Sequence, residues 1–128
     1  MASLCPAAEL QVEMDPVTRY LHIGYPVPDT APDRVRVECA WTPHGTDEWR
    51  AAKVMPLVSE TAINLASGEA IAQWREGAVT ERRAAGLVRT VIFNPYPDAQ
   101  RDGMVDIDFR IRLVAEGAIA EYTARIQA

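Results

Sequence analysis

Residues 103–128 alternate between apolar and polar side chains, and this alternation constrains the fold more than any other feature. From 105 to 113 the apolar residues are Val105, Ile107, Phe109, Ile111 and Leu113, and the charged residues between them are Asp106, Asp108, Arg110 and Arg112. Alternate side chains of a β-strand point to opposite faces, whereas a helix would scatter them. After a turn at Glu116-Gly117 the pattern repeats, with Ala120, Tyr122, Ala124 and Ile126 on one face. The chain is therefore predicted to end in a β-hairpin whose apolar face other strands must cover.

The first half contains three further alternating runs. Strands are predicted at 9–14 and 18–28, separated by Asp15-Pro16. The run 33–41 is predicted to be a central strand, with Val35, Val37, Cys39 and Trp41 pointing inward. Residues 42–48 are predicted to be a hairpin loop that leads to a return strand at 49–58. Two registers of the return strand stay open, one with Ala52 and Val54 inward and one with Trp49 and Ala51 inward.

The second half contains one segment with helical signals. In 67–77, Ser67 is placed as an N-cap and Gly77 as a C-terminal stop, which predicts one short helix. A further strand is predicted at 87–97, and 94–103 is predicted to be a long turn. Seven or eight strands at intervals of about a dozen residues are typical of an all-β antiparallel sandwich. We expect a single domain over 9–128, preceded by a flexible segment or cloning remnant at 1–8.

The charge of the chain disfavours two classes of partner. The sequence has 13 basic and 18 acidic residues, a formal net charge of -5, and Lys53 is its only lysine. An acidic chain without a basic cluster is a poor ligand for nucleic acid or for an anionic membrane surface, so neither partner is expected. The N-terminal segment lacks the features of a signal peptide. The compartment stays open: cytoplasmic, or extracellular or periplasmic if a signal was removed.

Few residues are suited to bind a cofactor or a metal. Cys5 and Cys39 lack the paired spacing of a zinc site, and no Gly-rich phosphate loop is present, so no metal or cofactor is expected. Cys39 is in phase with the apolar face of its strand and is predicted to be a buried thiol. A disulfide with Cys5 stays open for an exported protein.

Asp106, Asp108 and His44 are the candidates for catalysis. The two carboxylates point to the same face of a strand, about 7 Å apart, which is within the range of paired carboxylates in glycosidases. A small hydrolase that uses Asp106 or His44 is therefore one alternative. Alternating Asp and Arg residues are also a common way to keep an exposed sheet face soluble, and we favour this second interpretation.

The aromatic residues suggest binding rather than catalysis. Trp49, His44 and Tyr96 lie in loops or at strand ends, as do Trp41 and Tyr25. An exposed aromatic ring is a common platform for a sugar, so a free-standing carbohydrate-binding module that uses Trp49, His44 and Tyr96 is a second alternative. Trp41, however, is also in phase with the core.

Three arginines between 82 and 89 could hold an anionic ligand. They are Arg82, Arg83 and Arg89. Glu76 and Glu81 could balance them on a solvated strand face, and we favour this interpretation.

The pattern as a whole resembles a known family. The strand spacing, Trp41 at the end of VRVECAW, and the terminal pair DFRIRLVAEG and AEYTARIQA are similar to the immunoglobulin-like or fibronectin type III β-sandwich. Such modules often stand beside the catalytic domain in secreted bacterial enzymes that act on polysaccharides. The resemblance implies a non-catalytic module that docks onto a neighbouring catalytic domain or a protein subunit, as an accessory domain of an extracellular glycoside hydrolase. The fold alone would imply no function.

Overall fold

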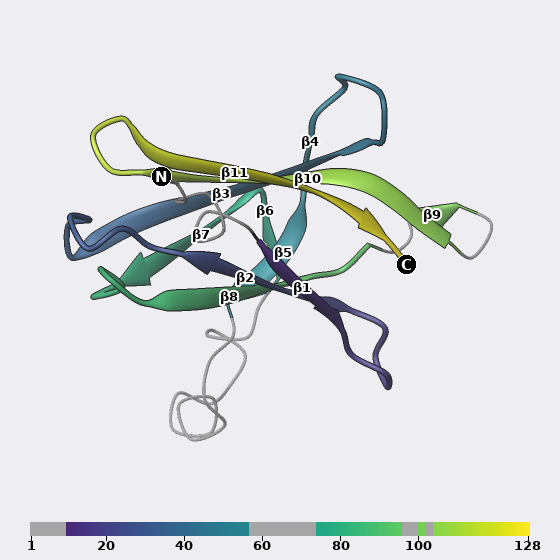
Figure 1. Ribbon diagram of the computed structural model, residues 1–128, viewed down its shortest axis with the longest axis horizontal. Coiled ribbons are helices and arrows are strands. Elements are labelled where there is room, and N and C mark those ends of the chain that lie inside the picture. The colour runs from purple at the N-terminus through teal and green to yellow at the C-terminus, as the bar shows by residue number, and fades with distance from the viewer. Residues whose placement is uncertain (1–9, 57–73, 96–99, 102–103) are drawn as a thin grey trace, which may run out of the picture.

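The computed structural model describes residues 10–56, 74–95, 100–101 and 104–128, which form two antiparallel β-sheets packed face to face (Figure 1). The first sheet consists, in spatial order, of β1 (Gln11–Met14), β2 (Leu21–Pro26), β8 (Val88–Phe93), β5 (Lys53–Pro56) and β6 (Arg75–Glu76). The second consists of β11 (Ala118–Gln127), β10 (Met104–Val114), β3 (Arg34–Pro43) and β4 (Arg50–Ala51). Two more strands join it, because β7 (Ala78–Arg82) pairs with β3 and β9 (Gln100–Arg101) pairs with β10. The predicted all-β antiparallel class is confirmed.

The inner faces of the two sheets form the core. The residues predicted to point inward from β3 and β10 are all buried, at 4% exposure or less: Val35, Val37, Cys39, Trp41, Val105, Ile107, Phe109, Ile111 and Leu113. In the return strand, Ala52 and Val54 are buried, which decides its register. At the centre, the ring of Phe109 lies 4.9 Å from the ring of Phe93 on the opposing sheet. Cys39 carries a free, buried thiol.

The two sheets are joined along one side by two runs of chain that bend at single residues. One run leaves the second sheet as β4 and enters the first as β5, bending at Ala52, and the other returns as β6 and β7, bending at Gly77. Two backbone hydrogen bonds tie the bends to β3: Ala52 N–H donates to Cys39 O (3.0 Å) and Cys39 N–H to Gly77 O (2.8 Å). A third joins the bends to each other, from Gly77 N–H to Ala52 O (2.8 Å). We call Cys39, Ala52 and Gly77 the corner. On the opposite side, β1 and β11 are the outermost strands of the two sheets.

Some predictions about the connections are wrong. The described residues contain no helix: 67–73 of the predicted helix lie outside them, and Arg75–Glu76 form β6, because they pair in register with Val54 and Lys53. The described residues contain more strand segments than the seven or eight predicted, partly because the corner divides two runs of chain. The predicted turn at 94–103 includes β9. The N-terminal segment 1–8 lies outside the described residues.

Candidate binding surface

The outer face of the second sheet carries an ordered set of charged side chains. On β3, β10 and β11 these residues alternate with residues that point into the sandwich. We call this surface the ladder face and define it by four arginines and four carboxylates: Arg36, Arg110, Arg112, Arg125, Glu38, Asp106, Asp108 and Glu121. The charges of these eight residues cancel, although the chain carries a net charge of -5. An acidic protein that approaches the chain is therefore repelled less by these eight residues than the net charge of the chain would suggest.

A line of ion pairs crosses the ladder face from β3 to β11. The carboxylate of Glu38 lies 3.3 Å from Arg36 Nε and 4.0 Å from Arg112 Nη1. Arg112 also donates from Nε and Nη2 to Glu121 Oε1, at 2.9 Å in each case. The register explains the line, because Arg112 stands opposite both Glu38 and Glu121. Exposed pairs of this kind contribute only about 0–1 kcal/mol each to stability, so their main effect here is to orient the side chains.

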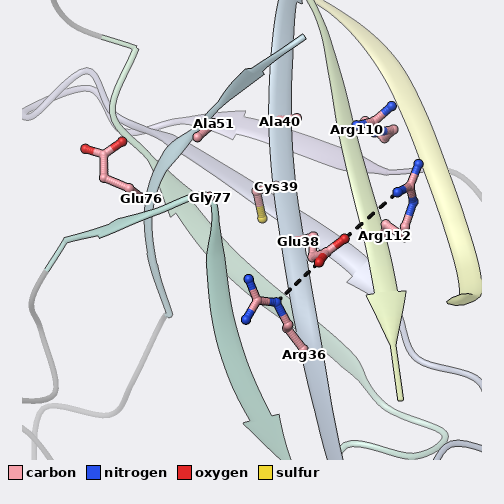
Figure 2. Close-up of a pocket in the computed structure, with 9 residues that line it drawn as sticks. All are labelled: Arg36, Glu38, Cys39, Ala40, Ala51, Glu76, Gly77, Arg110 and Arg112. Atoms are coloured by element: carbon pink, nitrogen blue, oxygen red, sulfur yellow. Dashed lines mark ion pairs between the residues drawn. The ribbon is translucent and has the colours of Figure 1, made fainter. Parts of the chain in front are cut away.

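A shallow pocket lies on the ladder face beside the corner (Figure 2). Its walls include Arg36 and Glu38 of β3, Arg110 and Arg112 of β10, and Gly77. Figure 2 shows the Glu38 carboxylate between the side chains of Arg36 and Arg112. The pocket has a volume of about 160 Å³, below the roughly 300–1,000 Å³ of sites that enclose a small molecule. Its size therefore suits a side chain of another protein better than a metabolite.

Asp106 is held by Arg125 at the end of the ladder face. Arg125 donates from Nε and Nη2 to the two oxygens of Asp106, at 3.0 and 3.1 Å. The hydrogen bonds from Arg125 lower the pKa of Asp106, and the nearby His44 adds to the effect. A carboxyl group with a lowered pKa is ionised at neutral pH, whereas the general acid of a glycosidase has to be protonated. Asp106 is therefore poorly suited to donate a proton.

The hairpin loop between β3 and β4 brings two of the predicted binding residues onto the ladder face. His44 Nδ1 lies 2.9 Å from Asp108 Oδ1. The guanidinium of Arg110 lies over the ring of Trp49, 4.4 Å from its centroid, and Trp49 Nε1 donates to Asp47 Oδ1 at 3.0 Å. Because Asp108 and Arg110 are successive outward residues of β10, His44 and Trp49 lie over the same stretch of this strand.

Local hydrogen bonds shape the hairpin loop. The hydroxyl of Thr42, a fully buried residue, accepts a hydrogen bond from the Glu48 N–H at 3.1 Å and bonds to the Thr46 hydroxyl at 2.7 Å. Gly45 supplies a positive φ of 87°, which favours glycine. These contacts hold the loop that carries His44 against the end of β10.

The other predicted aromatic residues are placed differently. Tyr96 lies outside the described residues. Trp41 and Tyr25 are 4% and 0% exposed, so neither is a platform for a ligand. The face of Trp49 that turns toward Arg110 is covered and its indole N–H is bound, which leaves less of this ring for a sugar.

Sequence reasoning missed the contact between Arg110 and Trp49. The alternation from 105 to 113 places Arg110 on the outer face, so part of the signal is present. The contact also depends on the sheet register, in which Ala40 of β3 lies between Arg110 of β10 and Ala51 of β4. A single sequence does not specify pairing between strands so distant in the chain.

A second polar cluster faces the inside of the sandwich. Tyr25 and Arg89 stand opposite each other on β2 and β8, and Arg89 Nε lies 3.4 Å from Glu81 Oε2. Burial raises the pKa values of Tyr25 and Glu81, and Arg89 opposes both shifts. Among the described residues the Tyr25 hydroxyl has no hydrogen-bond partner, although the residue is fully buried. Of the three arginines considered for anion binding, Arg89 is thus paired with Glu81.

We expect Tyr25→Phe to leave the free energy of unfolding unchanged or to raise it by about 1 kcal/mol, because a buried hydroxyl without a partner costs stability. Urea unfolding followed by circular dichroism measures the change. Tyr25→Ala is the control and should lower the free energy of unfolding by about 3–5 kcal/mol, since it removes the ring as well. A loss of more than about 1 kcal/mol in Tyr25→Phe would mean that the hydroxyl has a partner.

Comparison with protein-family models, curated proteins and solved structures finds no match to this chain. Within the part of the chain that the structure describes, no helix has the length and apolar character needed to cross a membrane.

Proposed function

We propose that the chain is a non-catalytic β-sandwich module that docks onto another protein through its second sheet. The strand order supports an immunoglobulin-like or fibronectin type III-like assignment. The orders β1-β2-β8-β5 and β11-β10-β3 correspond to the A-B-E-D and G-F-C orders of that architecture. Because this architecture hosts many functions, the argument for docking comes from the surface rather than from the fold.

The ladder face is the observation that carries the proposal. Its arginines and carboxylates are held in place by ion pairs, by the hairpin loop and by the stacking of Arg110 on Trp49. Arg and aromatic residues are enriched in protein interfaces, and alternating charges fix the register of a complementary partner. A set of paired charges that cancel, beside a pocket of side-chain size, therefore favours a protein partner.

The partner that we propose is a neighbouring catalytic domain or subunit of an extracellular glycoside hydrolase, with the chain as its accessory domain. The resemblance of the chain to accessory modules of polysaccharide-active enzymes supports this partner. The ladder face does not resemble an active site, and a catalytic partner would supply one.

We expect the chain to bind the catalytic domain that the source genome encodes beside it, as measured by isothermal titration calorimetry. Arg112→Glu should weaken this binding at least about tenfold, because it places three carboxylates where Arg112 now bridges Glu38 and Glu121. Lys53→Glu, the same change in charge on the exposed side of the first sheet, is the matched control and should bind as the unaltered chain does. No binding, or equal weakening by both variants, would contradict the proposal.

Carbohydrate binding is the second candidate function, because the structure places His44 and Trp49 over the same stretch of β10. Affinity electrophoresis on a panel of polysaccharides tests it, with Trp49→Ala as the variant that should abolish any retardation. Unchanged migration of the native chain on every polysaccharide would contradict carbohydrate binding. Release of reducing sugar in the same mixtures would instead support a small hydrolase with Asp106 or His44, which the lowered pKa of Asp106 disfavours.

A further inference from the structure

We infer that the free edge of β11 pairs with β11 of a second copy of the chain. This inference goes beyond the proposed docking function and names a further partner for the second sheet. β11 ends the strand order of that sheet, and among the described residues it pairs with β10 alone (Figure 1). The strand is 10 residues long. An edge strand of this length presents a row of backbone N–H and C=O groups on which another strand can form.

The hydrogen bonds to β10 decide which backbone groups of β11 face outward. Val105 and Ala128 exchange two bonds, Val105 N–H to Ala128 O at 2.8 Å and Ala128 N–H to Val105 O at 2.9 Å. In an antiparallel ladder such pairs alternate with pairs that exchange none, so the even-numbered residues of β11 bond to β10. The odd-numbered residues from Ile119 to Gln127 therefore direct their N–H and C=O groups away from the sheet.

One antiparallel register uses these outward groups and also matches the charges. If Thr123 stands opposite Thr123 of the second copy, Glu121 stands opposite the second copy's Arg125, and the reverse pair forms by symmetry. A register centred on Glu121 or on Arg125 would instead place like charges opposite each other. The line Glu38, Arg112, Glu121 on the ladder face would then continue into the second copy with Arg125, alternating in sign.

The inner face fits the same register. Tyr122 would stand opposite Ala124 of the second copy, and Ile126 opposite Ala120, so each large side chain meets a small one. Tyr122 and Ala120 are only partly buried and pack against the core. Pairing would cover more of this apolar surface.

Apart from its charged outward residues Glu121 and Arg125, β11 also lacks the features that usually protect an edge strand. It contains no proline and no lysine, its inward residues are uncharged, and the bulge in its pairing with β10 lies at its first residues. β1, the edge strand of the first sheet on the same side of the sandwich, has only 4 residues and is followed by Asp15-Pro16. The two edges therefore differ in the way expected if β11 alone is used for association.

Analytical ultracentrifugation of the full chain tests the inference. We expect a monomer–dimer equilibrium, with a monomer mass of 14.1 kDa. Thr123→Pro removes an outward N–H without removing a bond to β10, and Glu121→Arg sets like charges opposite each other at both symmetric positions. Each should weaken dimerisation at least about tenfold. The double variant Glu121→Arg/Arg125→Glu restores opposite charges across the interface and should regain most of the affinity that Glu121→Arg loses.

A charge control and a measurement on the native chain complete the test. Glu48→Arg makes the same change in charge in the exposed hairpin loop and should leave dimerisation unchanged. In the native chain, hydrogen exchange at the amides of Glu121, Thr123 and Arg125 should slow as protein concentration rises.

The possible results separate the pairing from the docking proposal. A native chain that sediments as a monomer at every concentration, or a dimer that survives Thr123→Pro, overturns the pairing. If that monomer still binds the catalytic domain, the docking proposal stands without self-pairing. A dimer that fails to bind the catalytic domain instead overturns the accessory partner and leaves the pairing in place.

Discussion

Replacing Phe109 with alanine is expected to lower the free energy of unfolding by about 3–5 kcal/mol. The side chain is fully buried, and its ring lies 4.9 Å from the ring of Phe93 on the opposing sheet. β10 holds Phe109 between Trp41 of β3 and Ala124 of β11, so the neighbours cannot fill the cavity without disturbing two strand pairs. Because domains of this size are stable by only about 5–15 kcal/mol, the loss would be a large fraction of the total.

Urea unfolding of Phe109→Ala beside two further variants checks this expectation. Phe109→Leu keeps most of the apolar volume and should cost clearly less than alanine. Val88→Ala, at a side chain that is 61% exposed on the first sheet, is the surface control and should stay within about 0.5 kcal/mol of the native chain. A loss below about 1 kcal/mol in Phe109→Ala would mean that the two sheets do not enclose this residue.

The inward faces of the long strands were predictable because burial in a sheet has a period of two residues. In β10 this period is uninterrupted, and it placed Phe109 in the core and Arg110 outside it. The terminal hairpin was predictable for the same reason, since its strands are close in the chain and their patterns agree. Local pattern therefore accounts for the faces of the strands.

The candidate binding surface was less predictable because it depends on pairing between distant strands. His44 meets Asp108 only because β3 and β10 pair, although the two residues are 64 positions apart in the chain. Several registers of that pair would bury the same apolar residues, and a sequence pattern does not choose among them. The covering of Trp49 by Arg110 depends on the same register.

The corner explains why a glycine was misinterpreted as the end of a helix. Gly77 has a φ of 83°, and glycine favours this conformation both after a helix and at a bend in a strand. Its neighbours decide between the two, because Arg75 and Glu76 pair with β5 and Ala78 begins the pairing with β3. The sequence signal was therefore correct about the backbone conformation and wrong about the element.

Gly77→Ala is expected to lower the free energy of unfolding by about 2 kcal/mol or more. A positive φ costs an L-residue roughly 1–2 kcal/mol. A Cβ atom at this position would also lie 3.2 Å from the Cβ of Ala51, a neighbour that Figure 2 shows beside the corner. Gly77 cannot move away freely, because its N–H and C=O bond to Ala52 and Cys39. Urea unfolding measures the loss.

Gly45→Ala separates the two causes of this loss, and a thiol probe locates it. Gly45 has a φ of 87°, but a Cβ there would meet nothing within 4 Å, so its variant reports the backbone strain alone. The difference between the losses in free energy of unfolding of the two variants therefore measures the crowding at the corner.

Burial raises the pKa of the Cys39 thiol to about 12 and shields it from reagents. In a Cys5→Ser background, Gly77→Ala should therefore speed the reaction of Cys39 with a thiol reagent more than Gly45→Ala does. Equal stabilities and equal thiol reaction rates in the two variants would show that Gly77 is not confined as the structure describes.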